Sequence, residues 1–246
     1  MKEITNVIEG RDMFTIKRAK PREIHFERDI NPYTHGSVIV SFGNTKVHIT
    51  ATVEESVPPF LKDKKQGWVT AEYSMLPGAT NTRNKRERTS ISGRSQEIQR
   101  LIGRSIRSVV DMKALGERSI TIDCDVLVAD GGTRTASITG GFVALSLAIK
   151  KLLKDGKLQS NPIKENLAAI SVGINKENEI IADLNYDEDS NCKTDMNIVM
   201  TGSGKYVEIQ GTAEDGAFTR EENNLMLDCA WNAIQIIIEK QNQVLN

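Results

Sequence analysis

Four consecutive residues, Gly131 to Arg134, are of types that bind an anion. Glycine lets the backbone approach a ligand closely, and the first N–H groups of a helix have no partner within the helix and lie at the positive end of its dipole. Thr133 adds a hydroxyl, and Arg134 adds a planar fork of donors. Phosphate would suit this segment. An ordinary turn with a solvated arginine is the alternative, and no GxxxxGK[ST] string marks a P-loop.

The segment from Gly78 to Arg107 concentrates positive charge in a chain whose formal net charge is only −1. It holds eight basic side chains against two acidic ones, and seven of the eight are arginine, which contacts phosphate through two donors at once. An RNA backbone fits this charge, and a solvated surface is the other interpretation. The spacing of the last three arginines indicates one helical face. The basic residues are Arg83, Lys85, Arg86, Arg88, Arg94, Arg100, Arg104 and Arg107.

A group of carboxylates follows in the second half of the chain, and its members are Asp187, Glu188, Asp189 and Asp195. Clustered carboxylates supply the hard oxygen ligands that Mg²⁺ takes together with waters and substrate phosphate. A polar surface loop is the alternative interpretation. A calcium loop of the EF-hand type does not fit, because Cys192 stands where that loop needs glycine and Ile198 where it needs glutamate.

Two other common kinds of catalytic site have no signal in the sequence. The three histidines, His25, His35 and His48, show no HExxH spacing, and no GxSxG string is present. Zinc-dependent hydrolysis and Ser-His catalysis are therefore disfavoured. His48 alternates with apolar neighbours in a predicted strand, so we interpret it as structural.

The composition is that of a folded protein of the reduced cell interior. With 39% hydrophobic residues among 246, the chain can bury a full core, and we expect a single domain over residues 1–246. The three cysteines form no CxxC pair, which favours a cytoplasmic location. We expect no membrane partner, because the start lacks a signal-peptide pattern and no later segment is predicted to reach membrane-spanning length.

Apolar periodicity predicts the elements that position these residues. Alternation over residues 36–54, broken at Gly43 and Asn44, predicts a hairpin, and alternation over 120–128 predicts a strand that ends just before the glycines. Spacings of three and four predict a helix over 95–110 and another after Gly132 that reaches Leu153. Further expected elements are strands over 67–75, 167–174 and 180–186, a hairpin turn at 201–205, a last helix from about 219 to 241, and a mobile loop over 78–93. Together they favour an α+β fold with mixed β-sheets packed on helices.

Longer strings resemble the bacterial ribonuclease PH family, in order and over nearly the whole chain. They are Gly67 to Pro77, Thr82 to Asn84, Gly93-Arg94, Glu97 to Ile102, Ala129 to Gly140, Asp189-Ser190, Thr194 to Asn197 and Gln210 to Glu214. The resemblance implies the ribosomal protein S5 domain 2-like fold, a homo-hexamer built as a trimer of dimers, and trimming of tRNA precursors beyond the 3′ CCA end. The implied reaction is phosphorolysis, with inorganic phosphate as co-substrate, nucleoside diphosphates as products, and extension of RNA 3′ ends in reverse.

The resemblance also implies a role for particular residues. The phosphate-binding residues would be Arg94, Gly132, Thr133 and Arg134, the catalytic and Mg²⁺-associated aspartates Asp189 and Asp195, and the RNA-binding loop arginines Arg83 and Arg86. Gly78 departs from the pattern, because family members commonly carry an arginine there. The alternative function is a non-catalytic RNA-binding ring subunit of an exosome-like assembly, which would be signalled by loss of the phosphate-binding residues or the aspartates. This chain has both sets.

Overall fold

The computed structural model describes residues 14–87 and 90–246. In it, the predicted hairpin forms from β3 (Gly36–Phe42) and β4 (Thr45–Glu54), which pair antiparallel around a turn where Gly43 has a φ of 54°. Val38, Val40 and Phe42 alternate along β3 and are fully buried, as the period of a half-buried strand requires.

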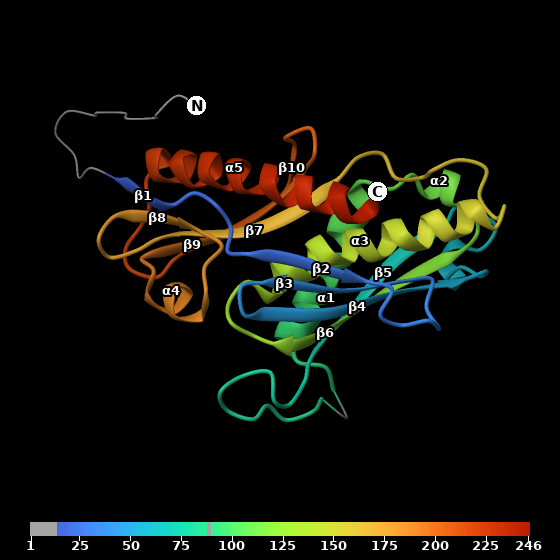
Figure 1. The fold of residues 1–246 in the computed structure, drawn as a ribbon, viewed down its shortest axis with the longest axis horizontal. Coiled ribbons are helices and arrows are strands. Elements are labelled where there is room, and N and C mark those ends of the chain that lie inside the picture. Colours follow the sequence, from blue (N-terminus) through green and yellow to red (C-terminus); the bar gives the residue numbers. More distant parts are fainter. Residues whose placement is uncertain (1–13, 88–89) are drawn as a thin grey trace.

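This hairpin lies inside a five-stranded sheet of order β2-β3-β4-β6-β5 (Figure 1). The other members are β2 (Ile24–Arg28), β5 (Trp68–Met75) and β6 (Ser119–Val128). Strands β5 and β6 run parallel while the remaining pairs are antiparallel, so the sheet is mixed, as expected.

The second sheet has the order β1-β8-β7-β9-β10. Its strands are β1 (Thr15–Arg18), β7 (Leu167–Ile174), β8 (Glu179–Ala182), β9 (Thr194–Thr201) and β10 (Tyr206–Ala213). Every residue of β7 is buried, and this central strand contacts both α3 and α5. The long helix α5 (Arg220–Leu245) runs along this sheet in Figure 1, and a capping box at Thr219 and Glu222 starts it.

The expected strand over 180–186 is wrong at its end. Strand β8 stops at Ala182, and residue Asp183 has a φ of 59°. Asn185 and Glu188 then form a capping box that starts the short helix α4 (Tyr186–Asn191). Three of the four acidic residues, which the sequence placed after a strand, are therefore held on a helix, and Asp195 lies on β9.

Helix α3 (Thr133–Lys154) lies between the two sheets and contacts β3, β4 and β7. Among the described residues it is the one helix long and apolar enough to cross a membrane, and 78% of its apolar window is buried inside the protein. The expectation that no segment approaches that length was wrong for α3. Its apolarity on all sides has a structural cause, since both of its faces pack on a sheet.

Helix α1 (Gly93–Ser108) packs on β5 and α3, and the short elements η1 (Pro59–Leu61) and α2 (Met112–Leu115) complete the described chain. Between β5 and α1, the described residues form no helix or strand, and this loop projects from the body in Figure 1. One cluster of buried apolar side chains includes residues of both sheets. The division of the chain into one domain or more stays a prediction.

Candidate active site at the junction of the two sheets

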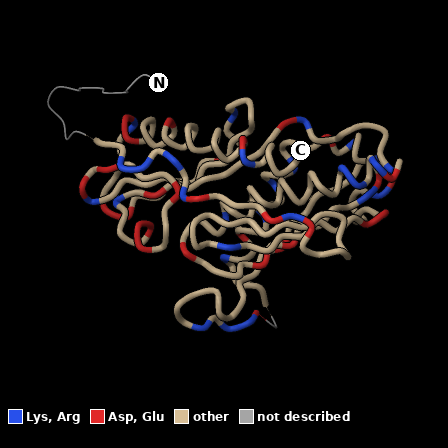
Figure 2. The backbone as a smooth tube through the Cα atoms, in the orientation of Figure 1, with Lys and Arg blue, Asp and Glu red and all other residues tan. Residues whose placement is uncertain are grey.

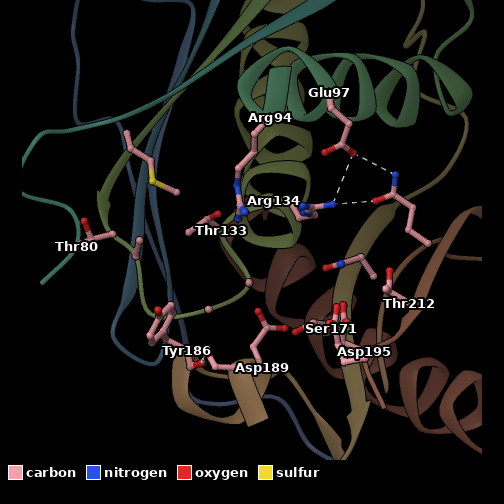
Figure 3. A pocket seen from close by; sticks show the side chains of 18 of the residues that line it. Thr80, Arg94, Glu97, Thr133, Arg134, Ser171, Tyr186, Asp189, Asp195 and Thr212 are labelled. Atoms are coloured by element: carbon pink, nitrogen blue, oxygen red, sulfur yellow. Dashed lines mark hydrogen bonds and ion pairs between the residues drawn. The ribbon is translucent and has the colours of Figure 1, made fainter. Parts of the chain in front are cut away.

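A cleft of about 990 Å³ opens where the two sheets meet (Figure 3). One wall comes from the starts of α1 and α3, and the other from α4, β9 and β10. Six of the eight predicted site residues line it, namely Arg94, Gly132, Thr133, Arg134, Asp189 and Asp195. The residues predicted to bind phosphate and the acidic residues, far apart in sequence, thus face one cavity.

The glycines bring the backbone into the cleft at the start of α3. Gly131 and Gly132 have φ values of 74° and 67°, in the left-handed region that favours glycine. No side chain caps the start of α3, and the backbone N–H groups of these two residues have no acceptor among the described residues. The segment therefore offers unpaired donors at the positive end of a 22-residue helix.

Thr133 is held at this helix start by a hydroxyl that the sequence pattern did not single out. Its Oγ1 lies 2.8 Å from the hydroxyl oxygen of Tyr73, which is buried on β5. Burial raises the pKa of Tyr73, so its hydroxyl stays neutral and can donate or accept. Tyr73 thereby fixes the direction in which Thr133 can present its own proton or lone pair.

Arg134 is oriented by two residues from different elements. Its Nη1 donates to Gln210 Oε1 on β10 at 3.0 Å and lies 3.6 Å from Glu97 Oε1 on α1. Gln210 Nε2 in turn donates to Glu97 Oε1 at 3.2 Å, which closes the triangle drawn in Figure 3. Both partners lay in the family-like strings, but their residue types alone gave no signal for this role.

Arg94 lies in the first turn of α1, on the same wall as Arg134. Ser92 caps this helix by accepting a hydrogen bond from the N–H of Ser95. The exposed Arg94 side chain makes no ion pair or hydrogen bond with any other described residue. Its donors are therefore available to a ligand in the cleft.

Asp189 on α4 and Asp195 on β9 face these arginines from the opposite wall (Figure 3). Burial raises the pKa of both carboxyls, and for Asp195 the nearby charges of Asp189 and Glu214 raise it further. Within the described residues neither carboxylate has a salt-bridge partner. Asp189 is exposed to the cleft and Asp195 is partly buried, and two neighbouring carboxylates without an ion pair are a suitable donor set for a divalent cation.

Arg83 and Arg86 do not line the cleft. Both are exposed in the loop between β5 and α1, and Figure 2 shows basic positions along this loop, away from the body of the molecule. Their neighbour Asn84 does reach the cleft, so the loop connects the basic surface with it. Arg88 lies outside the described residues.

Two of the three arginines predicted to share a face of α1, Arg100, Arg104 and Arg107, are engaged in contacts within the protein. Arg107 lies with its Cζ 4.3 Å from the ring centroid of Trp68 and donates to the backbone oxygen of Val69 at 2.8 Å. Arg104 pairs with Glu208 at 2.7 Å. Arg107 is therefore not free on that face, because its side chain stabilises the packing of α1 on β5.

Comparison with known proteins agrees with this fold and cleft. Residues 20–151 match domain 1 and residues 166–233 match domain 2 of the 3′ exoribonuclease family, and the chain belongs to that family. Its type within the family is that of ribonuclease PH. The chain is 58% identical over 226 residues to the ribonuclease PH of Bacillus subtilis strain 168, and the match covers 91% of this chain and 92% of the relative. It is 55% identical over 225 residues to the ribonuclease PH of Bacillus pumilus, and that match covers 91% of this chain and 93% of the relative. The sequence resemblance is thus confirmed.

Solved structures show the same fold at lower identity. Rice (Oryza sativa) Rrp46 superposes with a TM-score of 0.75 at 16% identity, over 93% of this chain and 97% of that one. A chain of the Archaeoglobus fulgidus exosome with RNA bound to the active site gives 0.74 at 19% identity, over 90% and 89%. These neighbours confirm the α+β class and are consistent with the S5 domain 2-like fold.

Proposed function

We propose that this chain is a phosphorolytic 3′→5′ exoribonuclease that trims tRNA precursors beyond the 3′ CCA end and extends RNA 3′ ends in reverse. One observation carries the proposal. Arg94, Arg134 and the unpaired N–H groups at the start of α3 lie on one wall of the cleft, and two unpaired carboxylates lie on the other. The first wall suits a bound anion and the second a bound cation, so the cleft can hold the two ions side by side.

The cationic wall would hold inorganic phosphate beside the last phosphodiester of the RNA. An oxygen of hydrogen phosphate attacks that phosphorus, and the bond to the 3′ oxygen of the preceding nucleotide breaks. The proton of the hydrogen phosphate balances the one taken up by the departing 3′ oxygen, so the products are a nucleoside 5′-diphosphate and a shortened RNA. Holding the two reactants in line contributes mainly by proximity. The fixed donors of Arg94, Thr133 and Arg134 offset repulsion between the two anions.

Asp189 and Asp195 would hold Mg²⁺. The fit rests on their side chains, which face the cleft without an ion pair among the described residues, and on the raised pKa values that such a cation would reverse. When bound, the ion would neutralise charge that develops on phosphoryl oxygens. A cation there also explains why two repelling carboxylates face a site built for phosphate.

Arg83 and Arg86 would contact the RNA backbone outside the cleft, since both are exposed on the projecting loop. Gly78 at the base of this loop is exposed, and a Cβ there would meet nothing within 4 Å. An arginine would therefore fit at this position, and the glycine in its place removes one positive charge from the loop. We expect tRNA engagement to depend more heavily on the remaining loop arginines.

We further propose a homo-hexamer, built as a trimer of dimers, in the cytoplasm. Exosome chains among the structural neighbours support an assembly, and several protomers, each of 27.3 kDa, would offer several copies of the basic loop to one tRNA. Sedimentation should give a species several times heavier than the protomer. A monomer with full activity on tRNA precursors would contradict this proposal.

A non-catalytic RNA-binding ring subunit is less well supported, because such a protein has no use for phosphate-binding and acidic groups facing one cleft. The deciding experiment incubates a tRNA precursor with and without inorganic phosphate and separates the products by chromatography. Nucleoside diphosphates that form only with added phosphate would support the proposal. Monophosphates formed in phosphate-free buffer would indicate hydrolysis and contradict it.

A further inference from the structure

Arg22, between β1 and β2, is nearly buried at the junction of the two sheets, with 11% of its side chain exposed. Its Nε donates to Asp183 Oδ2 at 2.8 Å and its Nη2 to Oδ1 at 2.9 Å, while its backbone N–H donates to Oδ2 at 2.9 Å. The Asp183 carboxylate is fully buried. This bidentate ion pair ties the start of the first sheet to the end of β8.

The same guanidinium also reaches the loop that precedes α3. Arg22 Nη1 donates to the backbone oxygen of Asp130 at 2.7 Å, and Nη2 donates to that of Gly131 at 3.4 Å. A Cβ added at Gly132 would lie 3.5 Å from Arg22 Nη2 and 3.6 Å from Asp183 Oδ1. The ion pair therefore lies directly beneath the two glycines that line the cleft.

These contacts determine where the loop N–H groups point. In a trans peptide, the carbonyl and the N–H of one peptide unit point in opposite directions. A hydrogen bond to the Asp130 oxygen thus turns the Gly131 N–H away from Arg22, and a bond to the Gly131 oxygen does the same for the Gly132 N–H. Thr45 Oγ1 supports this by donating to the Gly131 oxygen at 2.6 Å. Arg22 consequently sets the direction of both unpaired donors.

The loop packs closely on the chain that follows Asp183. A Cβ on Gly131 would lie 2.4 Å from the backbone oxygen of Leu184 and 2.5 Å from the carbonyl carbon of Asn185, so the loop packs on the backbone that follows Asp183. Asp183 is itself fixed, since its N–H donates to the Ser171 oxygen at 2.6 Å and its φ of 59° is uncommon outside glycine.

We propose that Arg22 and Asp183 are a positioning pair that aligns the phosphate-binding loop before α3 with the acidic wall of the cleft. The proposal rests on the proposed function of the cleft. Neither residue touches the substrate, because both lie behind the glycines. Their effect on catalysis acts through the direction of the Gly131 and Gly132 N–H groups and should therefore appear in the use of phosphate.

Arg22→Lys tests this with the buried charge kept opposite Asp183. An ammonium group on a flexible stem lacks the planar fork that holds one carboxylate and two carbonyl oxygens together. We expect the KM for phosphate to rise about tenfold, since small misplacement of a binding group has effects of this size or larger. The KM for a short RNA should stay within about twofold, and saturating phosphate should restore most of the turnover.

Arg118→Lys is the matched control outside the cleft. Arg118 is 15% exposed at its side chain, pairs with Glu55 at 3.3 Å, and donates to the backbone oxygens of Leu115 at 2.6 Å and Lys157 at 3.3 Å. It thus holds one carboxylate and two carbonyls, as Arg22 does. We expect the Arg118→Lys variant to have the same KM for phosphate as the wild type.

Asp183→Asn provides a second test, because asparagine keeps the size and tolerates a positive φ but removes the charge. We expect the KM for phosphate to rise as in Arg22→Lys, while the KM for a short RNA stays nearly unchanged. An unchanged KM for phosphate in folded variants, equal rises for phosphate and RNA, or an equal rise in Arg118→Lys would overturn the proposal. Loss of the folded state in both Arg22→Lys and Asp183→Asn, seen by circular dichroism, would assign the pair to stability and also overturn it. A wild type that makes no use of phosphate would instead refute the proposed function.

Discussion

Removal of Arg94 and removal of Arg134 should have unequal effects on the use of phosphate. Arg94→Ala takes away cationic donors that make no ion pair or hydrogen bond with other described residues. Arg134→Ala takes away similar donors but also leaves Glu97 without the guanidinium 3.6 Å from its Oε1. The second variant thus loses an attraction and exposes bound phosphate to a new repulsion.

The magnitudes follow from the contacts. A hydrogen bond to a charged group contributes about 1.5–3 kcal/mol, which corresponds to roughly a ten- to hundredfold weaker use of phosphate for Arg94→Ala. A carboxylate roughly 6 Å from the bound anion adds about 0.7–3 kcal/mol per unit charge for effective dielectric constants between about 80 and 20. Glu97 is 39% exposed at its side chain, so we expect a value near the lower end. Arg134→Ala should therefore be at least about threefold worse than Arg94→Ala.

The assay measures initial rates on a short single-stranded RNA as the phosphate concentration is varied at fixed Mg²⁺. The double variant Arg134→Ala with Glu97→Gln removes the new repulsion and should recover the additional loss, leaving a protein similar to Arg94→Ala. Equal losses in the two single variants, with no recovery in the double variant, would refute the assignment of Glu97 as the partner that restrains and balances Arg134.

The remaining predictions concern the opposite wall and the loop. Asp195→Asn should remove most activity without lowering the melting temperature of the metal-free protein. The raised pKa of this carboxyl means that its ionised form costs stability at neutral pH, a cost relieved as the pH falls through that pKa. Full turnover of the variant at limiting Mg²⁺ would contradict a metal-binding role. Arg83→Ala with Arg86→Ala should weaken tRNA precursor binding and reduce its salt slope by about 0.7 for each lost phosphate contact. Equal losses on short RNA would place these arginines at the reacting phosphate or in the fold.

Local patterns in the sequence predicted most of the cleft. Alternation followed by glycines identified the segment before α3. The start of α4 was missed, although Asn185 and Glu188 have the spacing of a capping box, because the apolar Leu184 extended the strand pattern past Ala182. The all-round apolar character of α3 followed from its position between two sheets, which periodicity alone does not show.

Contacts between distant residues could not be predicted in this way. Arg22 and Asp183 are 161 residues apart, and Glu97 and Gln210 are 113 apart, so no local spacing marks either pair. Arg107 had the spacing of a surface arginine, but its contact with Trp68 depends on how α1 packs on β5. The family resemblance pointed to the proposed phosphate-binding and acidic residues, while the side chains that contact and orient them became visible only in three dimensions.

The central claim is that phosphate, and not water, attacks the last phosphodiester. Its most direct test supplies inorganic phosphate labelled with ¹⁸O in all its oxygens and analyses the released nucleotides by mass spectrometry. Phosphorolysis predicts nucleoside 5′-diphosphates whose β-phosphate retains every labelled oxygen, including the one that bridges to the α-phosphate. Unlabelled nucleoside monophosphates, with the label left in free phosphate, would show attack by water and contradict the account.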